Sequence, residues 1–230
     1  MKPIQTQPNL AKQVEEAILD EITSGRLGPG SRVIQEQVAK TLGVSRQPVQ
    51  QALHILRSQG VLRDAPGRGL EVVPLDLVYV RNMYDIRSVI EGLACREAAL
   101  KHPDQAMARG ESIIAKGKDA VSRSAYAEMI AYDMAFHSLI YELAENPLIP
   151  AAMDTHWTTA QRVMGEVLHS DEEPRDIWRQ HEEILRAIAA GDANKAEELA
   201  RTHISLAADF MIDRLRQNQA ETAASNAEAS

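Results

Sequence analysis

The sequence contains little cysteine, few aromatic residues and no long apolar run, and each shortage excludes a class of structure. Among its 230 residues Cys95 is the single cysteine, so an internal disulfide framework is excluded. Aromatic residues make up 4% of the chain, so the core must be mainly aliphatic. The apolar runs are too short to cross a bilayer, and the opening MKPIQTQPNL lacks the pattern of a signal peptide. These absences favour a cytoplasmic protein without a membrane partner.

Positive charge is also scarce overall, but it is distributed unevenly along the chain. The net charge of −8 argues at first sight against a nucleic-acid partner. Residues 10–74, however, hold eight Lys or Arg against seven Asp or Glu, whereas residues 75–230 hold sixteen against twenty-six. Within residues 45–68 four arginines face a single acid, Asp64. Phosphate binding requires basic groups on one face only, so most of the acidity is assigned to a second domain.

Residues 41–60, TLGVSRQPVQQALHILRSQG, predict the end of one helix, a tight turn and a second helix. Gly43 can close the first helix in the left-handed conformation, Ser45 is a suitable N-cap, and Pro48 falls in the first turn, where a missing N–H costs nothing. The apolar face of the second helix consists of Val49, Ala52, Leu53 and Leu56. A buried stripe with exposed donors at the first turn is what major-groove reading requires. The predicted DNA contacts of this helix are Ser45, Arg46, Gln47, Gln50 and Arg57.

Two short extended runs, VLR and LEVV, follow this helix and are joined by DAPGRG. They predict a two-stranded wing with Arg68 at its tip, where it can reach the minor groove or its phosphates. The alternative is a solvated hairpin without DNA contacts. With two earlier helices, residues 10–74 are predicted to form a winged helix-turn-helix domain of three helices and a wing. Residues 1–9 are predicted to be a flexible arm.

Beyond residue 74 only helical periodicity is found, so the fold class is mainly α. We predict a linker at residues 75–79, an all-α bundle of about six helices at 80–217, and a disordered tail at 218–230. The first helix of the bundle is predicted to bury Met83, Ile86 and Ile90.

Polar residues interrupt three of the apolar stripes in this bundle. Asp133 and His137 lie one turn apart on the third helix, and His181 and His203 lie near the middle of the fifth and sixth stripes. A buried, unpaired carboxylate is costly. Hydrogen-bonded core histidines and an Asp–His pair would satisfy these groups, and so would a divalent metal ion bound by all four. Arg87 has two interpretations as well, an ion pair with Glu91 or a partner for a ligand carboxylate.

The chain resembles the GntR superfamily of bacterial transcription regulators, in the FadR-like branch whose C-terminal domain is of the FCD type. The resemblance rests on LGVSRQPVQQALHILRSQGVL with its GRG wing, and on YDIRSVIEGLACREAA, DMAFHSLIYELAENP, HEEILRAIAAGD and RTHI in that order. It implies that Asp133, His137, His181 and His203 bind a divalent metal, with zinc preferred over nickel or manganese. It also implies that Arg87 faces a pocket for a small organic-acid effector.

The resulting prediction is a homodimeric, effector-responsive repressor that binds a palindromic operator in double-stranded DNA and is not an enzyme. Gln50 and Gln51 stand where the family usually has Arg-Glu, so the operator sequence cannot be inferred from the resemblance. One alternative is a metal-dependent helical enzyme with an appended DNA-binding domain. Another is a regulator whose metal is purely structural or is itself the signal.

Overall fold

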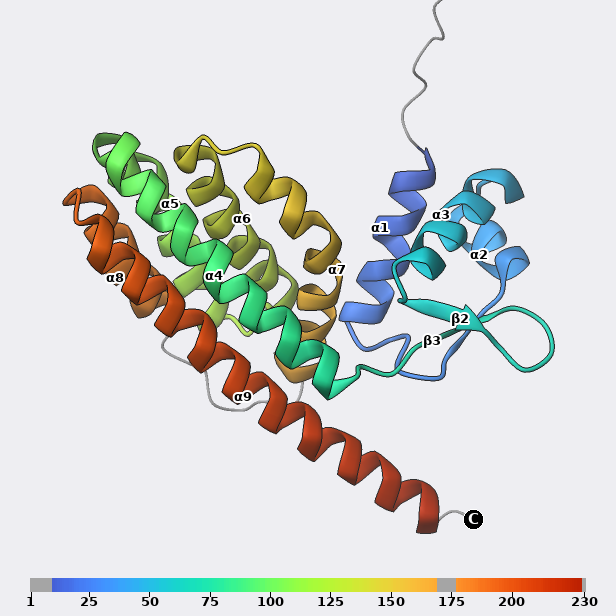
Figure 1. The fold of residues 1–230 in the computed structure, drawn as a ribbon. Helices are drawn as coiled ribbons and strands as arrows, with labels where there is room; N and C mark the ends of the chain where they lie inside the picture. The colour runs from blue at the N-terminus through green and yellow to red at the C-terminus, as the bar shows by residue number, and fades with distance from the viewer. Residues whose placement is uncertain (1–9, 169–176, 229–230) are drawn as a thin grey trace, which may run out of the picture. The chain divides into compact units, whose positions relative to one another are not determined.

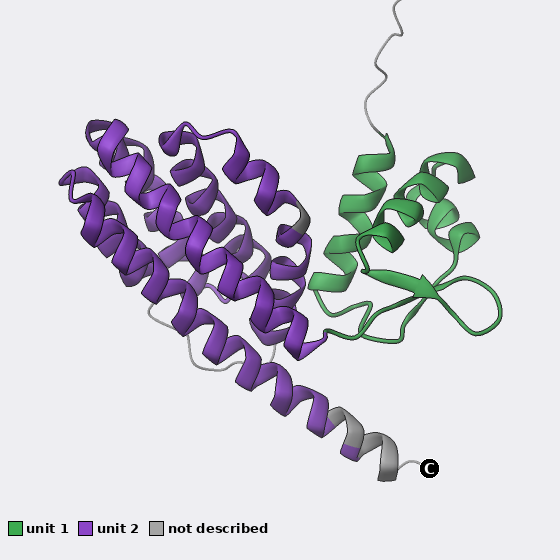
Figure 2. Cartoon of the chain, viewed as in Figure 1, with its two compact units in different colours: residues 1–75 green, residues 76–230 purple. Residues whose placement is uncertain are grey.

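The structure, a computed structural model, describes residues 10–168 and 177–228 and divides the chain into two compact units, residues 1–75 and 76–230 (Figures 1 and 2). The arm predicted at residues 1–9 lies outside the described residues. None of the described helices is both long enough and apolar enough to span a membrane.

The described part of the first unit, from residue 10 on, contains three helices and three short strands. Their bounds are α1 Leu10–Thr23, β1 Arg32–Val33, α2 Gln35–Leu42, α3 Arg46–Ser58, β2 Leu62–Asp64 and β3 Leu70–Val72. Gly43 ends α2 in the left-handed conformation, with φ 65°, and allows the tight turn into α3. The apolar faces of α1 and α3 pack together through residues such as Val14, Ile18, Val49 and Leu56. The helix-turn-helix therefore forms as the sequence predicts.

The wing differs from the prediction because it has a third strand. The strands are antiparallel in the order β1-β3-β2, and Arg32 of β1 pairs with Glu71 of β3. The sequence does not indicate this strand, because two residues are too few to show the alternation typical of a strand. The buried side chain of Val33 anchors β1 to the core.

The second unit is all-helical in its described part. Its helices are α4 Leu77–Lys101, α5 Pro103–Ser122, α6 Tyr126–Ala144, α7 Leu148–Leu168, α8 Ile177–Ala189 and α9 Ala193–Glu228. The most extensive helix packing in the described part of the unit is between α4 and α9 (Figure 1). α5 approaches α8 closely at Gly117, which has no side chain. A Cβ atom added there would lie only 2.1 Å from the Trp178 ring. These contacts hold α9 against α4 and α8 against α5.

Three boundaries and orientations differ from expectation. The linker predicted at 75–79 is shorter, since Asp76 accepts hydrogen bonds from the N–H groups of Val78 and Tyr79 and α4 begins at Leu77. The tail predicted to be disordered from residue 218 is helical as far as Glu228. Its Ala, Gln and Glu residues are good helix formers, and no Gly or Pro interrupts them. Ile86 was expected in the core but is 49% exposed.

Candidate metal centre and DNA-reading face

The DNA-reading residues predicted in the first unit are all exposed. Ser45, Arg46, Gln47, Gln50, Arg57 and Arg68 lie on the surface. Ser45 occupies the N-cap position of α3, but its side chain makes no capping hydrogen bond. Gln35 of α2 donates to the carbonyl oxygen of Arg46 over 2.9 Å and so connects α2 to the start of α3. The first turn of α3 therefore presents its polar side chains outward, which is the arrangement that groove reading requires.

A groove of about 520 Å³ separates α3 from the wing. Gln50, His54 and Arg57 line it from α3, and Gly69 and Leu70 line it from the other side. Arg57 also pairs with Asp64 of β2, with Nη1 3.0 Å from Oδ1. Two of the residues predicted to face DNA, Gln50 and Arg57, thus line this groove, whereas Ser45, Arg46, Gln47 and Arg68 are not among its lining residues.

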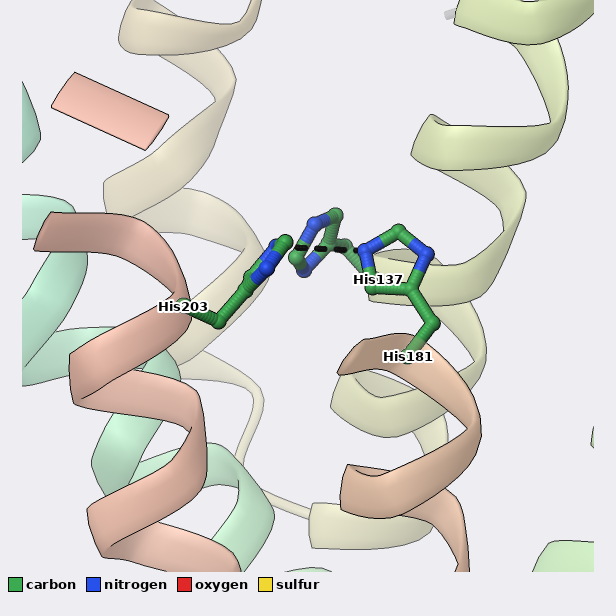
Figure 3. A group of neighbouring side chains, drawn as sticks. All are labelled: His137, His181 and His203. Carbon is green, nitrogen blue, oxygen red and sulfur yellow. Dashed lines mark hydrogen bonds between the residues drawn. The ribbon is translucent and has the colours of Figure 1, made fainter. Parts of the chain in front are cut away.

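Three buried histidines converge inside the second unit (Figure 3). His137 comes from α6, His181 from α8 and His203 from α9, and one ring nitrogen of each lies within 4.8 Å of the others. The Nε2 atoms of His181 and His203 are 3.1 Å apart. At most 4% of each residue is exposed.

Hydrogen bonds at the far side of two rings fix their tautomers. Nδ1–H of His137 donates to Oε2 of Glu91 over 2.7 Å, and Nδ1–H of His203 donates to Oε1 of Gln180 over 2.8 Å. Both rings therefore turn an Nε2 lone pair toward the centre of the cluster. This is the arrangement in which a carboxylate or amide orients a metal-binding imidazole.

Asp133 borders the same cluster. Its carboxylate oxygens lie 3.6 Å from Nε2 of His181 and 3.9 Å from Nε2 of His137, which is longer than a hydrogen bond. Burial raises the pKa of Asp133, and burial together with the neighbouring His203 lowers the pKa of His181 well below its ordinary value. A neutral imidazole at His181 is the form that binds metals.

The four side chains fit a divalent metal ion. Two nitrogens bound to one tetrahedral zinc at about 2.0–2.1 Å lie about 3.3–3.4 Å apart, and the observed Nε2–Nε2 distance of 3.1 Å is close to that. A shared cation would also satisfy Asp133, whose nearest imidazole nitrogens are otherwise too far for hydrogen bonds. Mixed nitrogen and oxygen donors suit zinc, nickel or manganese.

Arg87 lies in the same interior, 3% exposed, and makes the ion pair with Glu91 that one reading of the sequence predicted. Its Nη2 is 3.0 Å from Oε1 of Glu91, and its guanidinium lies over the rings of Tyr84 and Trp157. Burial opposes the charge of Glu91, yet His137 and Arg87 hold its pKa at about 2. Glu91 therefore connects Arg87 to His137 through opposite oxygens of one carboxylate.

Two residues of this network were not predicted as part of the site. Glu91 was considered only as a partner of Arg87, and Gln180 was not considered. Glu91 lies four residues after Arg87, on the same helix face. Gln180 directly precedes His181 in the sequence. That proximity was the one available signal, and it does not indicate which ring nitrogen each would contact.

Comparison with known proteins gives two family matches that together span most of the chain. Residues 10–72 match the model of the bacterial regulatory proteins of the gntR family, and residues 82–206 match that of the FCD domain.

Similar proteins share both parts of the chain. The HTH-type transcriptional repressor RspR of Escherichia coli is 26% identical over 199 residues, covering 86% of this chain and 87% of that repressor. A probable D-xylose utilization operon transcriptional repressor of Paenarthrobacter nicotinovorans is 30% identical over 205 residues, covering 87% of this chain and 88% of the relative. Among solved structures, E. coli McbR/YncC has a TM-score of 0.79 at 22% identity, over 90% of this chain and 99% of that one. At that identity the structural likeness supports the fold alone.

Proposed function

We propose, for a chain that belongs to the gntR family of bacterial regulatory proteins and carries an FCD domain, a role as an effector-responsive repressor of transcription. The family and the relatives are transcription regulators, so the chain is a DNA-binding regulator and not an enzyme. The observation that carries the sensory part of the proposal is the convergence of three buried imidazoles beside Arg87. A regulator acts where its DNA is, so we expect a cytoplasmic location.

The DNA-reading part assigns the operator contacts to the start of α3 and to the wing. Arg46, Gln47 and Gln50 would contact bases or phosphates, with Ser45 and Arg57 at the margins and Arg68 on the wing. Gln50 is suited to adenine, the bidentate partner of an amide side chain. Arg46→Ala should weaken operator binding by about 1–3 kcal/mol if Arg46 contacts a base. An unchanged affinity together with an unchanged salt dependence would contradict this docking.

The metal part assigns Asp133, His137, His181 and His203 as ligands of a divalent ion, zinc before nickel or manganese. The bound ion would supply a positive charge to which a carboxylate effector can bind. Elemental analysis of the purified protein tests this, with His137→Ala and His203→Ala beside a His102→Ala control. His102 pairs with Glu145 away from the cluster. We expect metal loss in the first two variants only, and wild-type metal content in both would refute the site.

The effector part assigns Arg87 to a small organic acid. Because Arg87 already pairs with Glu91, an effector carboxylate would share this guanidinium rather than meet an isolated charge. DNA affinity measured with a panel of mono- and dicarboxylates should change for the wild type and not for Arg87→Gln. An effect of the same acids on both proteins would place the effector elsewhere. Coupling requires that the acid bind two arrangements of the protein with different affinity.

The dimer part rests on the exposed face of α4. Its large apolar side chains at helical spacing are Val78, Ile86, Val89, Leu93 and Leu100. This pattern is nearly symmetric about Val89, so an antiparallel copy of α4 would face Val78 with Leu100 and Arg81 with Glu97. Two-fold symmetry in turn predicts a palindromic operator.

Sedimentation equilibrium tests this face. Val89→Arg should produce monomers and lower operator affinity, because a two-fold axis through Val89 would bring two charges together. Leu148→Arg is the matched control, since Leu148 is an exposed apolar residue on α7. Dimers of normal stability in Val89→Arg would rule out α4 as the interface.

A structural metal is the competing reading, and the burial of the cluster favours it. His181 is 0% exposed, and the outer nitrogens of His137 and His203 are already fixed by Glu91 and Gln180. If chelation unfolds the second unit and no carboxylate changes DNA affinity, the metal is structural. If metal addition alone changes DNA affinity in the folded protein, the metal is the signal.

A further inference from the structure

One carboxylate, that of Glu36, contacts two of the three arginines assigned to DNA, Arg46 and Arg68. Glu36 lies in the first turn of α2. Its Oε1 is 2.6 Å from Nη2 of Arg46 at the start of α3, and its Oε2 is 3.3 Å from Nη2 of Arg68 in the wing. One residue of α2 thus joins the recognition helix to the wing.

Arg32 holds the backbone of the wing loop next to Glu36. Arg32 of β1 donates from Nη1 to the carbonyl oxygen of Arg68 over 3.0 Å and from Nη2 to that of Pro66. Gly69, with φ +96°, lets the loop pass close to β1, since a Cβ there would lie 3.1 Å from the carbonyl oxygen of Val33. Because the loop backbone is fixed by Arg32, Glu36 acts on the side chain of Arg68 rather than on the shape of the loop.

The contribution of these ion pairs to folding is small. The side chains of Arg46, Glu36 and Arg68 are between 55% and 80% exposed, and exposed ion pairs contribute about 0–1 kcal/mol. Phosphate is the other anion that forms strong bonds with guanidinium, so DNA would compete with Glu36 for Arg46 and Arg68. Both guanidinium groups must then exchange Glu36 for phosphate, or share a site with its negative charge.

We propose that Glu36 is a positioning residue that holds Arg46 and Arg68 in the free protein and competes with DNA phosphate for them. It thereby sets the ionic part of the affinity for DNA of any sequence. This inference rests on the proposed DNA-reading role of Arg46 and Arg68.

The expected size follows from counterion release. One additional phosphate contact steepens the slope of log K against log salt by about 0.9. If the curves of Glu36→Gln and wild type meet near 1 M salt, the variant binds about fifteenfold tighter at 50 mM and about fourfold tighter at 200 mM. A change in folding stability alone would not produce this dependence on salt.

The test is fluorescence anisotropy of the full-length protein with a duplex of mixed sequence, titrated at several salt concentrations. Glu36→Gln is compared with wild type, with Glu36→Asp, and with Glu21→Gln as the matched control. Glu21 pairs with Arg26 and not with Arg46 or Arg68, so its amide removes the same charge from the same unit. Circular dichroism melting confirms that each variant is folded.

The inference holds if Glu36→Gln alone steepens the slope by about one contact, while Glu36→Asp and Glu21→Gln stay near wild type. Equal slopes for Glu36→Gln and Glu21→Gln would overturn it, because the effect would then be one of net charge. Weaker binding by Glu36→Gln would also overturn it. Absence of DNA binding by the wild type at every salt concentration would refute the proposed DNA-reading role itself, and the role of Glu36 would fall with it.

Discussion

The substitution Glu91→Gln is conservative in shape, but we expect it to lower the free energy of unfolding of the second unit strongly. Glu91 is 1% exposed, and its two oxygens contact Arg87 and His137 over 3.0 and 2.7 Å. An amide keeps the shape of the side chain but removes the charge that compensates Arg87, which is itself 3% exposed. Breaking a buried ion pair by removing one partner costs about 3–5 kcal/mol. We expect a loss of this size in the free energy of unfolding.

The assay can follow this unit alone. The chain has two tryptophans, Trp157 and Trp178, and both belong to the second unit, so their fluorescence during urea unfolding does not report on the first. Glu183→Gln on α8 is the matched control, since its exposed i,i+4 pair with Arg179 is worth about 0.3–0.5 kcal/mol. If the two variants lose similar stability, the Arg87–Glu91 pair is not the buried network described above.

A second comparison separates lost charge from lost shape. The double variant Arg87→Met with Glu91→Leu removes both charges and should be more stable than Glu91→Gln, because apolar replacements of a complete buried pair are often neutral or stabilising. Glu91→Gln should also weaken metal binding about 10–100-fold if His137 is a ligand, as is usual for the loss of such an outer partner. A double variant less stable than the single one would show that the hydrogen bonds, not the charge, are decisive.

Three further predictions concern packing, reactivity and capping. Gly117→Ala should destabilise the second unit by about 1–3 kcal/mol or more, because its Cβ would overlap the Trp178 ring; a chemical melt against wild type measures this, and an unchanged midpoint would refute the close approach of α5 and α8. Burial and the nearby Glu91 raise the pKa of the Cys95 thiol, so a thiol reagent should modify it only after unfolding; rapid native labelling would contradict its burial. Asp76→Ala removes two hydrogen bonds at the start of α4 and should cost about 1 kcal/mol, visible as a lower thermal midpoint of the tryptophan signal.

The helix-turn-helix could be predicted from sequence because local rules decide it. Gly43 supplies the left-handed turn, Pro48 occupies the first turn of α3, and Val49 and Leu56 bury one face. Each of these choices depends on neighbours within one or two turns, which a sequence shows directly.

The exposure of Ile86, the strand β1 and the helical tail could not be predicted from the periodicity of the sequence. Ile86 has the period of a core residue, but α4 is covered by partners on other faces and leaves this one exposed. β1 has two residues and forms only because β3 offers an edge. The small, polar residues after position 217 led us to predict disorder. They are also good helix formers, and α9 continues through them to Glu228.

The candidate metal centre could be predicted only in part. Periodicity placed Asp133 and His137 on one face of a helix, and it placed His181 and His203 inside. Their convergence depends on how α6, α8 and α9 pack together, and helices that lie far apart in the sequence meet through contacts such as Gly117 of α5 against Trp178 of α8. The metal itself and the DNA contacts stay predictions.

The connection between β3 and α4 has a consequence for the operator. Only residues 73–76 join the last strand of the wing to the first helix of the second unit, and four extended residues span about 13–14 Å at most. In a dimer formed through α4, each DNA-binding unit must therefore stay within this distance of the N-terminus of its own α4. A movement of a few ångströms between the two α4 N-termini would change the half-site spacing that both DNA-binding units can bind at the same time. Lengthening this connection by a flexible insertion should therefore relax the spacing requirement while leaving each half-site's sequence preference intact.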